Sequence, residues 1–130
     1  MWQDVCRFIY RVEEIMYDII GDVHGCAAML AELLKKLGYS ENKGSFSHPE
    51  RKAVFLGDII DRGREIREVL WIVRSMVDAG HALCVMGNHE FNAICFHTED
   101  ENCGFLRSHN EKHTDQHKMT LAAFFRYTGE

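Results

Sequence analysis

Short apolar runs alternate with longer amphipathic stretches along the first two thirds of the chain. The runs cover residues 17–21, 53–56 and 82–86, and each of them reaches a glycine. Between the runs, apolar residues recur at helical spacing over residues 26–37 and 64–79. Strands and helices that alternate in this way predict an α/β fold, in which βαβ units build a partly parallel sheet with flanking helices.

The segments outside this alternation are less regular. Residues 1–15 carry apolar side chains at helical spacing, which predicts an amino-terminal helical extension before a domain over residues 16–130. This extension either packs on the domain or is an appendage that precedes a natural start at Met16. Polar residues and the only proline predict loops over residues 40–50 and 98–104, and a last helix is predicted over residues 109–127.

Composition narrows the class of protein. A chain of 130 residues suits one domain with one core. The net charge of −5 without a long basic run disfavours nucleic acid as a partner. No apolar stretch is long enough to cross a membrane, and charged residues interrupt any secretory signal. Five cysteines without CxxC spacing predict reduced thiols in a cytoplasmic protein, with Cys26 and Cys84 acting as small hydrophobic residues.

Metal-ligand and acid–base residue types follow all three apolar runs. Asp22 and His24 come after the first run, and because they are two positions apart they would share one side of an extended chain. The other two runs are followed by the same kinds of side chain: Asp58, Asp61 and Arg62 after the second, and Asn88 and His89 after the third. In open parallel sheets the functional crevice lies beyond the carboxyl ends of the strands, so these side chains are predicted to converge.

Taken singly, each of these features has a structural alternative. Asp22 and His24 could belong to a capped turn without metal, and Asp61 with Arg62 could form an ion pair at the start of a helix. His89 could be a polar loop residue. A nucleotide-binding Rossmann domain is disfavoured because the turn after the first run lacks the G-x-G-x-x-G loop.

Three motifs in order carry a resemblance to a known family. GDVHG at residues 21–25, GDIIDRG at 57–63 and GNHE at 87–90 are similar to the first three signature blocks of the calcineurin-like metallophosphoesterases. The GDxxDRG form resembles the branch that contains serine/threonine phosphoprotein phosphatases and bacterial diadenosine tetraphosphatases. The resemblance covers the amino-terminal portion of that fold, and it implies about half of an α/β/β/α sandwich.

The resemblance also implies a role for each motif residue. Asp22 and His24 would bind a first metal ion, Asp58 would bridge two ions, and Asn88 would bind the second. The implied cofactors are two divalent ions, with manganese first and iron or zinc as alternatives.

The same resemblance implies the acid–base and phosphate-binding groups. His89 would be the general acid, Asp61 would orient it, and Arg62 would hold the phosphate. The implied substrate is a phosphorylated small molecule, a dinucleoside polyphosphate or a phosphoprotein, hydrolysed at a dinuclear metal site.

Two features complicate this expectation. The later histidine blocks of the family are not found after Glu90, so the alternative is an incompetent fragment that binds metal or phosphate, or serves as an interaction module. Missing cover would also expose one apolar face of the sheet and favour self-association. The residues expected on that face are Ile19, Val54, Leu56, Leu83 and Val85.

Three further histidines recur at helical spacing. His109, His113 and His117 are each four residues apart and could form a separate zinc site. The alternative is a solvated or substrate-facing helix surface, which is favoured because no acidic or cysteine partner is evident in the sequence.

Overall fold

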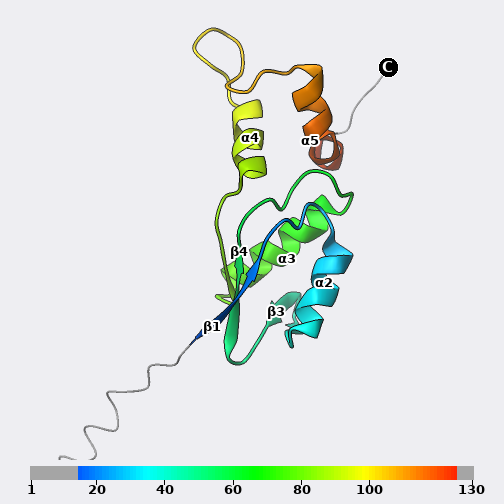
Figure 1. Cartoon of the computed structure of the whole chain (residues 1–130), viewed down its shortest axis with the longest axis vertical. Helices are drawn as coiled ribbons and strands as arrows, with labels where there is room; N and C mark the ends of the chain where they lie inside the picture. Colours follow the sequence, from blue (N-terminus) through cyan, green and yellow to red (C-terminus); the bar gives the residue numbers. More distant parts are fainter. Residues whose placement is uncertain (1–14, 126–130) are drawn as a thin grey trace, which may run out of the picture.

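The computed structural model describes residues 15–125, and its centre is a three-stranded parallel sheet (Figure 1). The strands are β1 (Met16–Ile20), β4 (Arg51–Phe55) and β5 (Ala82–Cys84), in the spatial order β1-β4-β5. Ile20 pairs with Phe55, and Phe55 pairs with Cys84, so the three strands end at one edge. The predicted parallel sheet is confirmed, and the convergence of its carboxyl ends follows from this register.

Two helices cover one face of this sheet. Helix α2 (Ala27–Lys36) follows β1, and α3 (Ile66–Asp78) joins β4 to β5. Because both crossovers proceed in the same direction across the sheet, right-handed connections place both helices on the same face. Their inner sides pack with the inward residues of the strands into one core, which includes Leu34, Ala53, Phe55, Val69 and Met76.

The other face of the sheet is largely uncovered in the described residues. Ile19 is 61% exposed and Leu83 is 54% exposed, Leu56 and Val85 are similarly exposed, and Val54 is half-buried. The expected exposure of this face is therefore confirmed for four of its five residues. Self-association through the face stays a prediction, and the predicted helix over residues 1–15 lies almost wholly outside the described residues.

A hairpin replaces the loop predicted over residues 40–50. Strands β2 (Ser40–Asn42) and β3 (Ser45–Ser47) pair antiparallel, so the loop prediction is wrong for this segment. Lys43 and Gly44 both have positive φ angles, of 51° and 81°, which is the backbone that a two-residue hairpin turn requires. The core side chain of Phe46 gives the hairpin an apolar anchor that outweighs its polar composition.

Two helices stand beyond the carboxyl edge of the sheet (Figure 1). Helix α4 (Asn88–Phe96) is not among the predicted elements, and α5 (Glu111–Phe124) is shorter than the predicted 109–127. The segment between them is irregular and contains one isolated bridge, from Glu99 to Phe105, in agreement with the predicted loop. None of the helices in residues 15–125 has the length and apolarity needed to span a membrane.

The thiol of Cys84 is a further correction. The sequence places it in an apolar run, but the residue is exposed at the end of β5, which is an edge strand of the sheet. Cys26 is half-buried at the residue before α2.

Candidate active site

Backbone hydrogen bonds join the segments that follow β1 and β4. The N–H of His24 donates to the carbonyl of Asp58 at 2.9 Å, and the N–H of Gly25 donates to that of Ile59 at 2.7 Å. Gly63 closes the arrangement, because a Cβ at this position would lie 2.3 Å from the carbonyl oxygen of His24. Only glycine permits this approach, so the second motif needs its final glycine in order to pack on the first.

Five of the predicted site residues have left-handed backbone. Their φ angles lie between 43° and 66°, and they are Asp22, His24, Asp58, Asp61 and Arg62. Such conformations cost residues other than glycine about 1–3 kcal/mol each and cluster at functional sites. The backbone hydrogen bonds between the two segments hold these residues in place, so the side chains are directed by the tertiary structure and not by local preference.

Four side chains form what we call the metal-ligand group: Asp22, His24, Asp58 and Asn88. Ligand atoms of the first three all lie within 4.8 Å of one another. The terminal amide of Asn88 lies 3.1 and 3.2 Å from the two carboxylate oxygens of Asp58. The structure therefore brings together all four residues that the sequence analysis assigned as metal ligands.

The donor set of this group suits a divalent cation. His24 is buried, and its Nδ1–H donates to the carbonyl of Ile60 at 2.9 Å, which fixes the tautomer and leaves Nε2 as the free ligand atom. That Nε2 lies 3.7 Å from Oδ1 of Asp22. With its NH₂ group toward Asp58, the amide of Asn88 donates to both carboxylate oxygens, and flipping the amide would turn its oxygen toward a bound cation.

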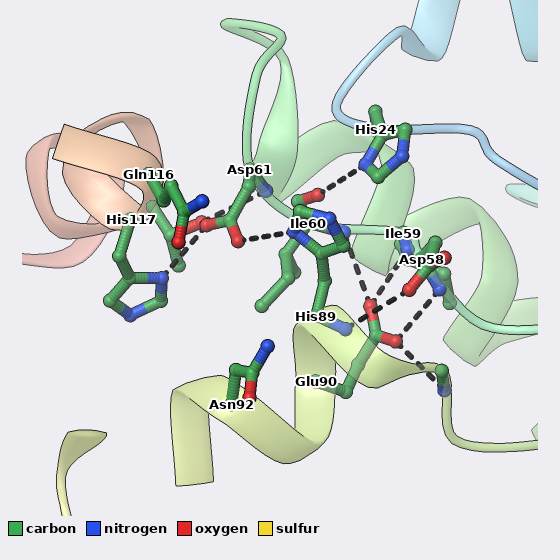
Figure 2. A network of polar contacts seen from close by, with 12 residues as sticks. His24, Asp58, Ile59, Ile60, Asp61, His89, Glu90, Asn92, Gln116 and His117 are labelled. Carbon is green, nitrogen blue, oxygen red and sulfur yellow. Dashed lines mark hydrogen bonds and ion pairs between the residues drawn. The ribbon is translucent and has the colours of Figure 1, made fainter. Parts of the chain in front are cut away.

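A second cluster, which we call the Asp61 network, comprises Asp61, His89, His117 and Thr120. Figure 2 shows Asp61 between the two histidines. Oδ2 of Asp61 lies 2.7 Å from Nδ1 of His89. Its Oδ1 accepts from His117 Nδ1 at 2.8 Å and from the Thr120 hydroxyl at 2.6 Å. The pairing of Asp61 with His89 is as expected, whereas His117 and Thr120 were not predicted to take part.

Burial and hydrogen bonding compete at Asp61. Burial would raise the pKa of this carboxyl group, but hydrogen bonds from His117, Thr120 and His89 together outweigh it and hold the pKa below its ordinary value. The carboxylate is therefore ionised over the neutral range. Because an ionised carboxylate only accepts hydrogen bonds, both imidazoles must carry a proton on Nδ1.

Arg62 lies at the mouth of the site. Its side chain is exposed, and with His89 it lines a hollow of about 330 Å³ whose other walls include Asp115, Gln116 and Lys118 from α5. A guanidinium in this position has a free fork of donors that matches phosphate oxygens. The structure thus places Arg62 beside the predicted acid, although it shows no ligand between them.

Glu90 has a structural role that the sequence analysis did not assign. Its carboxylate accepts from the backbone N–H groups of Asp58 and Ile59, both at 2.7 Å, and of Gly87 at 3.0 Å (Figure 2). One carboxylate thus ties the start of α4 to the segment after β4. The signal in the sequence was the acidic residue three positions after Gly87, which is the pattern of a helix N-terminus.

The three regularly spaced histidines do not share one site. His117 is buried and faces Asp61, whereas His109 stacks between the rings of Phe96 and Phe105, at 3.9 and 4.0 Å. Nδ1 of His113 lies 2.9 Å from the carbonyl of Ser108. Within residues 15–125, only Asp22, His24 and Asp58 form a cluster of three or more metal-ligating side chains, so a zinc site formed by the three histidines is not supported.

Comparisons with known proteins agree with the motifs. The family model described as Calcineurin-like phosphoesterase matches residues 17–128. The chain is 49% identical over 76 residues to the bis(5'-nucleosyl)-tetraphosphatase PrpE [asymmetrical] of Halalkalibacterium halodurans, a match that covers 58% of this chain and 31% of that protein. The PrpE of Bacillus subtilis is 43% identical over 74 residues, with 56% and 30% covered. These matches therefore span less than a third of each relative's length.

Solved structures show the same fold. A protein serine/threonine phosphatase from Saccharomyces cerevisiae superposes with a TM-score of 0.52 at 22% identity, over 70% of this chain and 27% of that one. The cold-active protein-tyrosine phosphatase of a psychrophilic Shewanella gives a TM-score of 0.50 at 26% identity, over 87% and 35%. The α/β sheet with flanking helices is thus shared with phosphatases.

Proposed function

This chain belongs to the calcineurin-like phosphoesterase family, and we propose that it hydrolyses a phosphate ester or a dinucleoside polyphosphate with the help of two bound divalent metal ions. The observation that carries this proposal is the meeting of two different groups at one sheet edge. The metal-ligand group and the Asp61 network are joined directly, because the backbone N–H of His89 donates to Oδ1 of Asp58 at 3.0 Å.

The metal-ligand group would hold the ions. Asp22 and His24 would bind the first, Asn88 would bind the second, and Asp58, whose carboxylate lies between these residues, would bridge both. Ions held there would lower the pKa of a water molecule to give a nucleophile at neutral pH and would neutralise phosphate charge. Manganese is our first candidate, with iron or zinc as alternatives.

The remaining residues would handle the substrate and the proton. With Nδ1–H of His89 directed at Asp61, its Nε2 is the atom left to donate a proton to the leaving oxygen. Arg62 would bind phosphate oxygens in the hollow that it lines with His89. Asp61 would act only by holding the imidazole in this tautomer.

A dinucleoside polyphosphate is the proposed substrate class. The support is the 49% identity with a protein named as a bis(5'-nucleosyl)-tetraphosphatase, in a match that includes less than a third of that protein. Phosphoprotein substrates are a second candidate, because the structural neighbours are named as protein phosphatases. A cytoplasmic location is also proposed, and the cysteines of the described residues, Cys26, Cys84, Cys95 and Cys103, are all free.

The test is metal-dependent turnover by this chain. Metal-free protein is supplied with manganese, iron or zinc and assayed on p-nitrophenyl phosphate, diadenosine tetraphosphate and a phosphopeptide. Asp58→Asn should remove turnover, whereas the matched change Asp78→Asn, at the exposed end of α3, should not. Turnover that needs no metal, or that survives Asp58→Asn, would contradict the proposal.

A further inference from the structure

Helix α5 reaches into the candidate site through two buried side chains. His117 is 5% exposed and Thr120 is 8% exposed, and both contact the carboxylate of Asp61, which is 4% exposed. These contacts join residues that are 56 and 59 positions apart in the sequence. Burying a polar side chain costs free energy unless it has a hydrogen-bond partner. The fold therefore depends on these contacts being formed.

The hydrogens of this cluster have only one consistent arrangement. The hydroxyl of Thr120 accepts from the backbone N–H of Asp61 at 3.0 Å, so its single proton is free to donate to Oδ1 of Asp61. His117 donates to the same oxygen from Nδ1. The other carboxylate oxygen, Oδ2, then accepts a hydrogen bond from His89 alone.

This arrangement constrains Asp61 at both its main chain and its side chain. Thr120 holds the backbone of a residue whose φ angle is 66°, and with His117 it fixes the rotation of the carboxylate. Without these donors, Oδ1 would be unsatisfied and the carboxylate could rotate away from His89. The rings of Phe96 and His117 lie 5.2 Å apart, which keeps the imidazole of His117 packed in this orientation.

We propose that His117 and Thr120 of α5 are positioning residues, which lock the Asp61 carboxylate and thereby hold His89 in the tautomer and orientation needed for proton donation. The catalytic part of this inference rests on the proposed function. The structural part, that α5 sets the state of His89, does not need turnover to be tested.

The variants follow from the geometry of the donors. His117→Leu removes one donor to Asp61, and Thr120→Val removes both a donor and the acceptor of the Asp61 N–H, each with little change of volume. His117→Asn and Thr120→Ser restore a donor at about the same place, since the amide nitrogen of asparagine overlies Nδ1 of histidine. Thr114→Val, on the same helix but without a side-chain contact to Asp61 in the described residues, is the matched control.

The first measurement is NMR of the imidazole nitrogens in ¹⁵N-labelled, metal-free protein. In the unmodified chain, neutral His89 should carry its proton on Nδ1, which leaves Nε2 as the atom that takes up the proton to be donated. His117→Leu and Thr120→Val should convert His89 to a mixture of tautomers, and His117→Asn and Thr120→Ser should restore the single form. An unchanged His89 in a folded His117→Leu or Thr120→Val variant would overturn the inference.

The second measurement separates a positioning role from general damage. The ratio of kcat/KM on phenyl phosphate to that on p-nitrophenyl phosphate should fall about tenfold in His117→Leu and Thr120→Val, since only the poorer leaving group needs the acid fully. Thr114→Val should leave the ratio unchanged. Equal losses on both substrates would contradict a positioning role, whereas absence of turnover in the unmodified chain would refute the proposed function and leave the NMR result to decide this inference.

Discussion

Asp22 and Asp61 are both aspartates with left-handed backbone beyond the carboxyl end of a parallel strand, yet their surroundings are opposite. The side chain of Asp22 is 81% exposed and has His24 as its one ion-pair partner, at 3.7 Å, in the described residues. The side chain of Asp61 is 5% exposed and receives three side-chain hydrogen bonds. The carboxylate of Asp22 is open to a ligand from outside the chain, whereas the chain itself supplies the hydrogen-bond donors of the Asp61 carboxylate.

The difference extends to the two clusters that contain these residues. The metal-ligand group uses acceptor atoms that have few donors nearby, so its stability should depend on a bound cation. The Asp61 network carries its own donors, so it should form without any ligand. Polar groups that lack hydrogen-bond partners within the chain therefore indicate the binding site. Polar groups that have such partners indicate the residues that support the site.

The largest expected effect is on metal binding. Asp58→Asn removes the carboxylate that faces Asp22, His24 and Asn88, and it should lower metal affinity by more than about 100-fold, since losing even an outer-shell partner costs about 10–100-fold. Turnover should be lost with the metal. Calorimetric titration with manganese measures the affinity, and Asp78→Asn is the control.

Loss of the acid should follow a different route. His89→Asn should lower kcat by about 10²–10⁴-fold, the usual contribution of a positioned acid or base, and should leave metal affinity nearly unchanged. The same titration and the p-nitrophenyl phosphate assay check both parts. If His89→Asn lost metal while Asp58→Asn retained it, the division between the two clusters would be wrong.

Stability should distinguish the two aspartates directly. In metal-free protein, Asp61→Asn should lower the free energy of unfolding by about 2–3 kcal/mol, because an amide cannot accept from all the donors that surround it. Asp22→Asn should change it little, since that side chain is exposed and asparagine tolerates left-handed backbone. Urea unfolding measures both, and equal losses would remove the contrast.

The smallest expected effect concerns His97, whose Nε2 lies 3.3 Å from Nε2 of His117. Partial desolvation of the ring, with added repulsion from His117 and His109, lowers the pKa of His97, although the residue is exposed overall. The folded chain therefore binds this proton less readily than the unfolded chain, so the stability is complete above about pH 6.5 and declines as the pH falls through the window just below it. His97→Gln should make that decline shallower in unfolding curves recorded from pH 7 downwards, and superimposable curves would contradict this account.

Much of the metal-ligand group could be predicted from the sequence. Asp22 and His24 follow one apolar run, and Asp58 and Asn88 follow the next two. Once these runs are strands of one parallel sheet, the register places their ends together, so convergence needs no further information. The three motifs also sufficed to identify the family that the comparisons show.

Other features depended on context that a local pattern does not contain. The hairpin over Ser40–Ser47 has polar strands, and its formation depends on Phe46 packing into a core that distant segments build. Glu90 is an ordinary acidic residue until its carboxylate meets the backbone of a segment about 30 positions away. Local composition predicts a loop for the hairpin segment and a solvent-exposed side chain for Glu90. Tertiary packing overrides both predictions.

The role of α5 was decided by the tertiary structure alone. The spacing of the three histidines predicts that they share one helix face. The helix begins at Glu111, however, so His109 lies before it and packs between two phenylalanine rings, while His117 turns toward Asp61. Helical spacing fixes the direction of side chains relative to one another and leaves free the rotation of the helix about its axis. That rotation is set by packing against α3 and the end of α4, and it is what makes His117 and Thr120 partners of a residue more than 50 positions away.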